Sequence, residues 1–332
     1  MVSETAALIP MLPAAMAIVC LAVYVLADGF DLGVGFLLLL APRQQDRDVM
    51  MASVAPGLDG NEAWLVMGGL LLLAVLPSGG SSPSPALYVP VAVMLAALVF
   101  RGIVLALRPR LVRLRWVCDC AFAGGSLLAT LCQGVILGVL VGGVAVRSGQ
   151  GGGGVLDDVA LPALCGAGLI GGYALLGAGW LIWRADGPAQ VFGREVAHAA
   201  IVLTGATVVA LTLWGAFGLP SIVRLAPLAA LAALLLLFAW RRIWTGRRGE
   251  IFLLAMLIVL LGFAALVVDL WPSAVSPNAA IRNAVAALQA HLVMAGGAAI
   301  VVAAALVCQA RAGMVLLGKV GRPAAGYGGA DS

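Results

Sequence analysis

The sequence predicts an all-α protein that crosses a membrane many times. Hydrophobic residues make up 63% of the 332 residues and charged residues only 10%, whereas a soluble domain carries about 25% charged residues. Apolar runs recur from one end of the chain to the other, and about 20 apolar residues suffice for one helical crossing of a hydrocarbon core about 30 Å thick. The basic residues collect in alternate gaps between these runs. We therefore expect a polytopic membrane protein with about nine transmembrane helices.

Glycine, proline and charged clusters mark the ends of the apolar runs. The first run carries acids and lacks a basic N-terminal region, so we expect it to be retained as a helix rather than removed as a signal peptide. The predicted spans cover residues 10–41, 54–77, 86–107, 117–145, 160–184, 197–218, 222–242, 250–271 and 289–317.

These spans divide the chain into three segments. Residues 1–148 are expected to form a four-helix transmembrane unit. Residues 149–159 are glycine-rich, and we interpret them as an external linker because nothing around them has the strand-to-helix context of a phosphate-binding loop. Residues 160–332 are expected to form a second four-helix unit, one peripheral helix and a short cytoplasmic tail.

The basic residues predict the orientation. With nine spans the two termini lie on opposite sides, and one set of alternate gaps together with the C-terminal end holds fifteen of the nineteen cations. The positive-inside rule then places the N-terminus outside and the C-terminus in the cytoplasm, and we expect a bacterial cytoplasmic membrane. The net charge of +4 comes without a basic stripe that alternates with aromatics, so we expect no nucleic-acid partner. The cations on the inner side are Arg43, Arg47, Arg108, Arg110, Arg113, Arg115, Arg184, Arg194, Arg241, Arg242, Arg247, Arg248, Arg311, Lys319 and Arg322.

Tryptophans fall near the predicted span ends, where the indole ring prefers the headgroup region. The cysteines lack the spacing of a zinc site or a CxxC pair, so we expect packing roles and no metal site in this chain. The tryptophans of this predicted belt are Trp116, Trp180, Trp183, Trp214, Trp240, Trp244 and Trp271.

Six ionisable residues gather at cytoplasmic depth in the first four spans. Ionisable groups inside a span are costly, so each is a candidate for function. Spacings of three residues put the acids of the first span on one helix face, and likewise those of the second. Gly29 and Gly33 of the first span and Gly57 and Gly60 of the second should let these two helices approach closely. The six residues are Asp28, Asp31, Asp59, Glu62, Arg101 and Asp119.

Five carboxyls and one arginine cannot all be ionised at low dielectric, so some carboxyls are expected to hold protons that exchange near neutral pH. Such a cluster, open to the cytoplasm, would be a proton entry path. The alternative is structural: the same residues cap helices and tie the first span to its neighbours through Arg101.

Two histidines limit what the chain can do with haem. His198 lies near the inner start of the sixth span and His291 near the outer start of the ninth, so one haem cannot use both. A site made of His291 and Met294 stays open, but we expect this chain alone to bind no cofactor.

The segment that starts at Ala27 reads A-D-G-F-D-L-G-V-G, and the segment from Asp59 to Leu65 reads D-G-N-E-A-W-L. These segments resemble the first-helix signature and the second-helix motif of one known family, subunit II of cytochrome bd-type and cyanide-insensitive quinol oxidases. Phe100-Arg101-Gly102, Asp119, Gln133-Gly134, Tyr173 to Leu181 and Leu270-Trp271-Pro272 follow in the order of the family. The chain departs from the family at Leu58, Ala106 and Ser276.

The resemblance implies a heterodimer in the respiratory electron-transport chain. Subunit I would carry haem b, with haem d left open, and would oxidise quinol and reduce oxygen; subunit II would be a haem-free subunit without the catalytic centre. Membrane lipids, quinone and a small accessory subunit are further expected partners. Asp28, Asp31, Asp59 and Glu62 would relay protons, Asp119 would collect them, and Arg101 would tune the carboxyls. Asn61 and Trp64 belong to the second-helix motif and would pack around the acids.

Two alternatives stay open. Proton-coupled secondary transporters also place acids in glycine-rich helices, although the second half of this chain has no counterpart of the acidic cluster. A purely structural subunit would need the acids only for assembly.

Overall fold

A computed structural model describes residues 11–75, 85–147, 155–218 and 222–274, with the short stretches 296–297, 302–303 and 306–307. Every regular element in these residues is helical, which confirms the predicted all-α class. Six helices of this described part are long and apolar enough to cross a membrane. The chain is therefore a multi-pass α-helical membrane protein.

The first four predicted spans correspond to four long helices. These are α2 (Met11–Leu37), α4 (Leu58–Val75), α5 (Pro85–Leu107) and α6 (Arg115–Arg147). Single turns of 3-10 helix follow α2 (Leu38–Leu40) and precede α6 (Val112–Leu114).

The next four predicted spans correspond to α7 (Val155–Arg184), α8 (Pro188–Gly218), α9 (Ile222–Arg242) and α10 (Arg248–Ala274). Helix α7 begins inside the predicted linker, so residues 155–159 are helical and the rest of the linker lies outside the described residues. The ninth predicted span, 289–317, and the predicted tail fall almost entirely outside them.

Helix α8 begins at Pro188 rather than at residue 197. Proline is favoured at the first position of a helix because its fixed φ suits the helix and its missing N–H would have no partner there. Gly187 precedes it with a φ of 69°, a left-handed conformation that glycine adopts without steric cost. The tight turn from α7 therefore leads directly into α8.

A short helix, α3 (Gln44–Val54), occupies a segment that we expected to be a cytoplasmic loop. It buries Met50, Met51 and Val54 on one face, and this burial explains why a charged segment stays helical. The Trp180 Nε1 atom donates to Ser53 Oγ at 3.2 Å, so α3 is also tied to α7.

Trp180 is wrongly placed in the predicted headgroup belt, because it is buried. Its ring stacks on Phe30 with 4.4 Å between centroids and meets Phe252 at 5.4 Å. The Arg184 guanidinium lies 5.4 Å from the same ring. Proximity to a span end cannot distinguish a lipid-facing indole from one that faces the protein.

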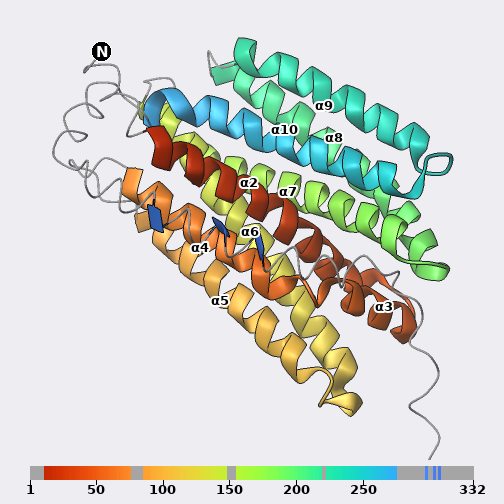
Figure 1. Cartoon of the computed structure of the whole chain (residues 1–332). Helices are drawn as coiled ribbons and strands as arrows, with labels where there is room; N and C mark the ends of the chain where they lie inside the picture. Colours follow the sequence, from red (N-terminus) through yellow and green to blue (C-terminus); the bar gives the residue numbers. More distant parts are fainter. Residues whose placement is uncertain are drawn as a thin grey trace, which may run out of the picture.

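Helices α2 and α7 lie at the centre of the bundle, with α4, α5 and α6 on one side and α8, α9 and α10 on the other (Figure 1). Helix α2 packs on α4, α6 and α7, and α7 packs on α2, α6, α8 and α10. One hydrophobic core includes residues from both predicted units. The two units are therefore joined along the contacts of α7 with α2 and α6.

Glycines allow α2 and α7 to approach at backbone distance. A Cβ atom on Gly33 would lie 1.9 Å from the Tyr173 carbonyl oxygen, and one on Gly177 would lie 2.5 Å from the Val34 nitrogen. Our expectation that Gly29 and Gly33 face the second span is wrong, since both face α7. The α2–α4 contact instead uses Gly68, which lies against Leu21.

Candidate functional site

The centre of the site is an ion pair that lies wholly inside the protein. Arg101 of α5 donates from Nη2 to Asp28 Oδ1 of α2 at 2.6 Å, and both side chains are 0% exposed. The guanidinium also lies 5.6 Å from the ring centre of Phe122 on α6. Three helices therefore surround one buried cation.

Asp31 lies one helical turn further along α2 and is also fully buried. Its Oδ2 atom accepts a hydrogen bond of 2.6 Å from Asn61 Nδ2 on α4. Asn61 donates as well to the carbonyl of Ala27 at 3.0 Å, which fixes the amide against α2. Two of the residues from the predicted motifs thus meet at the α2–α4 contact.

The other predicted residues of α4 lie close to Asn61 in the sequence. Glu62 is partly buried, Trp64 is buried, and the side chain of Asp59 lies outside the described residues. Trp64 packs with Tyr24 and Cys20 of α2 in a small apolar cluster.

Several buried polar atoms around this pair have no protein partner within the described part of the chain. Buried polar atoms in proteins usually bind ordered water where no protein group reaches them. These atoms, which lie on α2, α4 and α5, therefore have the chemistry of groups that bind water. The atoms are Asp28 Oδ2, Asp31 Oδ1, Trp64 Nε1, Arg101 Nε and Arg101 Nη1.

Three neutral polar residues extend the site, and sequence reasoning assigned none of them a role. Gln133 of α6 donates from Nε2 to the Tyr24 hydroxyl on α2 at 2.7 Å and accepts at Oε1 from the Tyr173 hydroxyl on α7, also at 2.7 Å. Tyr24 is close enough to Asp28 to interact with it. Tyr24, Asp28 and Asp31 follow an i, i+4, i+7 spacing, so one face of α2 carries all three.

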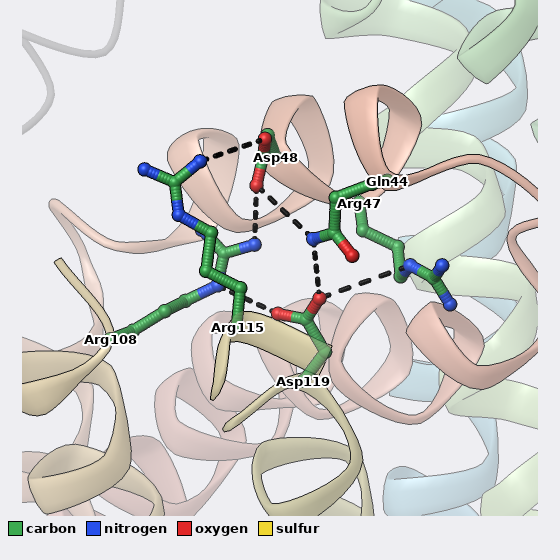
Figure 2. Close-up of polar contacts among 6 residues, drawn as sticks. All are labelled: Gln44, Arg47, Asp48, Arg108, Arg115 and Asp119. Atoms are coloured by element: carbon green, nitrogen blue, oxygen red, sulfur yellow. Dashed lines mark hydrogen bonds and ion pairs between the residues drawn. The ribbon is translucent and has the colours of Figure 1, made fainter. Parts of the chain in front are cut away.

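Asp119 makes its contacts in a different cluster, at the end of the bundle that carries α3 (Figure 2). Its carboxylate accepts from Arg108 Nε at 2.7 Å and from Gln44 Nε2 at 2.8 Å. Arg108 also donates to Asp48 Oδ1 of α3 at 2.5 Å. Arg47 and Arg115 lie at longer ion-pair distances of 3.9 and 3.8 Å from Asp119 and Asp48.

The expected single group of six charged residues is therefore divided into two sets of contacts. Asp119 lies in the first turns of α6, where it meets Arg108 just beyond the end of α5, whereas Arg101 lies further inside α5. Burial lowers the pKa of Arg108, but hydrogen bonds to Asp119 and Asp48 outweigh it and raise the pKa above its usual value. This cluster ties α3 to the α5–α6 turn.

We expect Asp119→Asn to destabilise the chain by about 3 kcal/mol, because the change leaves Arg108 with less charge compensation beside a nearly buried position. Thermal unfolding in detergent measures this effect. Asp46→Asn is the matched control, since Asp46 lies in the first turn of α3 and no ion pair to it is found among the described residues. Equal unfolding midpoints for the two variants would contradict the expected role of Asp119.

Metal-ligand side chains do not cluster in the described part of the chain. No group of three or more His, Cys, Asp or Glu side chains within them could hold a metal ion. His198 lies edge-on to Trp240 at 4.7 Å, and its Nδ1 atom is 2.9 Å from the carbonyl oxygen of Arg194. His291 lies outside the described residues, so the absence of haem from this chain stays a prediction.

Comparison with known proteins gives one family. A family model described as cytochrome bd terminal oxidase subunit II matches residues 9–315. Subunit 2 of the cytochrome bd-I ubiquinol oxidase of Escherichia coli K12 is 35% identical over 124 residues, which are 36% of this chain and 33% of that protein. Subunit 2 of the Bacillus subtilis cytochrome bd ubiquinol oxidase is 30% identical over 122 residues, 36% of each chain. The aligned stretch thus spans about a third of each of these two relatives.

The fold also resembles a solved structure. A chain of the bd oxidase from Geobacillus thermodenitrificans superposes with a TM-score of 0.67 and 15% sequence identity, over 89% of this chain and 97% of that one. At this identity the comparison shows the fold alone.

Proposed function

This chain belongs to the cytochrome bd terminal oxidase subunit II family, and we propose that it is the haem-free second subunit of a bd-type quinol oxidase. In this proposal the complex oxidises quinol and reduces oxygen to water. The relatives named as ubiquinol oxidase subunits support the assignment. A haem-bearing subunit I is the partner and contains the catalytic centre. A small accessory subunit, lipids and quinone complete the proposed surroundings.

The contribution of this chain is a cytoplasmic entry path for protons. The main support for this path is the buried group formed by Asp28, Asp31 and Arg101, which includes more carboxyls than cations. A carboxyl that cannot remain ionised at low dielectric can accept and release a proton. Polar atoms without protein partners adjoin these carboxyls, and water bound there would connect them.

The remaining predicted residues complete the proposed route. Asp59 and Glu62 stand on the same helix as Asn61, which contacts Asp31. Asp119 stands in an arginine-rich cluster at the α3 end, and the proposed orientation makes that end cytoplasmic. Asp119 would collect protons there, and Arg101 would set the charge balance deeper in the protein. We place the complex in a bacterial cytoplasmic membrane, with the N-terminus outside.

The first test is purification of the full chain in mild detergent together with any subunits that co-purify. We expect a haem-bearing subunit, a reduced-minus-oxidised haem spectrum and quinol-driven oxygen consumption. A chain that purifies alone, colourless and stable would contradict the oxidase assignment and favour a proton-coupled transporter.

The second test separates the proton path from a scaffold role. We expect Asp31→Asn to lower quinol-driven oxygen consumption about tenfold or more, because a positioned proton-transfer group contributes on the order of 10² or more to a rate. The haem spectrum of the same preparation reports assembly, and Asp46→Asn serves as the control. Full activity of Asp31→Asn and of Asp59→Asn in normally assembled complexes would refute the path and leave a purely structural subunit.

A further inference from the structure

We propose that the two buried aspartates of α2 have different tasks: Asp28 remains a carboxylate anion that neutralises Arg101, and Asp31 is the carboxyl that holds and exchanges the proton. Tyr24, Gln133 and Tyr173 are positioning residues that keep Asp28 in its ionised form. This inference rests on the proposed function and specifies which group of the path is protonated at rest.

The charge balance requires the two carboxyls to differ. One guanidinium and two carboxyls share a region in which all three side chains are 0% exposed. With both carboxyls ionised the region would carry an uncompensated buried negative charge, which is strongly unfavourable. One proton on either carboxyl makes these three described groups neutral together, so the question is which aspartate holds it.

Protonation of Asp28 would disrupt the strongest contact of the site. Its Oδ1 atom accepts the 2.6 Å hydrogen bond from Arg101, and charge-assisted bonds of this kind are about twice as strong as neutral ones. A proton on Asp28 would remove that charge and leave the guanidinium without its counter-ion.

The Tyr24–Gln133–Tyr173 chain has a direction that also favours an anion at Asp28. An amide oxygen can only accept and an amide nitrogen can only donate, so Tyr173 donates to Gln133 Oε1 and Gln133 Nε2 donates to Tyr24. The Tyr24 oxygen is then an acceptor, and its own hydrogen is left for another group. Asp28 interacts electrostatically with Tyr24, and its Oδ2 atom has no hydrogen-bond partner among the described residues, so this carboxylate is available to accept that hydrogen.

Asp31 differs from Asp28 in that its hydrogen-bond donor is a neutral amide rather than a cation. Its Oδ2 atom accepts from Asn61, and its Oδ1 atom has no hydrogen-bond partner among the described residues. A proton on Oδ1 would leave the Asn61 bond in place, because the carbonyl oxygen of a protonated carboxyl still accepts. Protonation of Asp31 therefore costs no contact that the described residues make.

Infrared spectroscopy of the purified complex tests the assignment, since a protonated carboxyl has a carbonyl stretch that a carboxylate lacks. We expect a band that disappears in Asp31→Asn. Asn61→Ala removes the hydrogen bond to the Asp31 carbonyl and is expected to move this band to higher wavenumber, whereas Tyr24→Phe is expected to leave its position unchanged. A shift in Tyr24→Phe without one in Asn61→Ala would place the proton on Asp28 and overturn the proposal.

A second pair of variants keeps the test decisive if Asn61→Ala fails to assemble. Asp31→Glu should move the band and Asp28→Glu should not; the reverse, or no such band in the unmodified complex, would overturn the proposal. The spectrum is recorded without turnover, so its result is distinct from the activity test of the proton path. If the infrared bands contradict the assignment but Asp31→Asn is still inactive, only the division of tasks between Asp28 and Asp31 is rejected, and the proton path stands.

Discussion

Arg101→Met is expected to destabilise the folded chain by about 3–5 kcal/mol, the cost of removing one partner from a buried ion pair. The change leaves Asp28 without a cation in a region from which solvent is excluded. Asp28 must then take up a proton or remain as an unpaired buried charge, and both states are unfavourable. Thermal unfolding of the detergent-solubilised complex should show a large drop in midpoint together with loss of activity.

The double variant Asp28→Asn/Arg101→Met is the matched control for this effect. It removes both charges, so its stability should exceed that of Arg101→Met alone, and the difference measures the coupling between the two side chains. A double variant as unstable as the sum of the two single variants would show that Arg101 stabilises α5 by packing, for example against Phe122, and not through Asp28.

Gly33→Ala is expected to prevent stable packing of α2 on α7. The added Cβ would lie 1.9 Å from the Tyr173 carbonyl oxygen and close to the Gly177 backbone. Backbone atoms of two helices cannot move aside as a flexible side chain can, so the helices must separate along their contact. We expect little assembled protein after purification, measured by size-exclusion chromatography in detergent.

Gly69→Ala on α4 provides the control for this prediction. A Cβ atom at Gly69 would meet nothing within 4 Å, and alanine in a helix is more favourable than glycine by about 0.5–1 kcal/mol. The yield of Gly69→Ala should therefore equal or exceed that of the unmodified chain. Normal assembly of Gly33→Ala would contradict a backbone contact between α2 and α7 at this position.

Apolar runs bounded by glycine, proline and charged residues predicted the long helices well, because each crossing of the hydrocarbon core needs about 20 apolar residues. The predicted and observed bounds of α9 agree at both ends, 222 and 242. Helix α8 begins nine residues before the predicted residue 197, because Pro188 starts the helix and the charged residues after it are helical. Helix α3 was missed because its buried face is only a few residues long.

The site was predicted in part. The acids of the first span were singled out by the cost of charge at membrane depth, and Asp28 and Arg101 do form a pair. Sequence spacing does not identify which helix covers a given face. It indicates that Gly33 shares a face with Gly29 but not that α7 covers that face. Gln133, Tyr24 and Tyr173 carry no charge that would single them out, yet the spacing of Tyr24 with Asp28 and Asp31 on one face of α2 could have indicated Tyr24.

The contact between Tyr173 and α2 has a consequence for biosynthesis. The ring of Tyr173 lies against Gly29, its carbonyl lies against Gly33, and its hydroxyl binds Gln133. Ribosomes complete α2, α4, α5 and α6 before α7, so the newly inserted first half lacks the hydroxyl that completes the buried hydrogen bonds. Until α7 is inserted, the Gln133 Oε1 atom therefore lacks the Tyr173 donor that satisfies it in the folded protein.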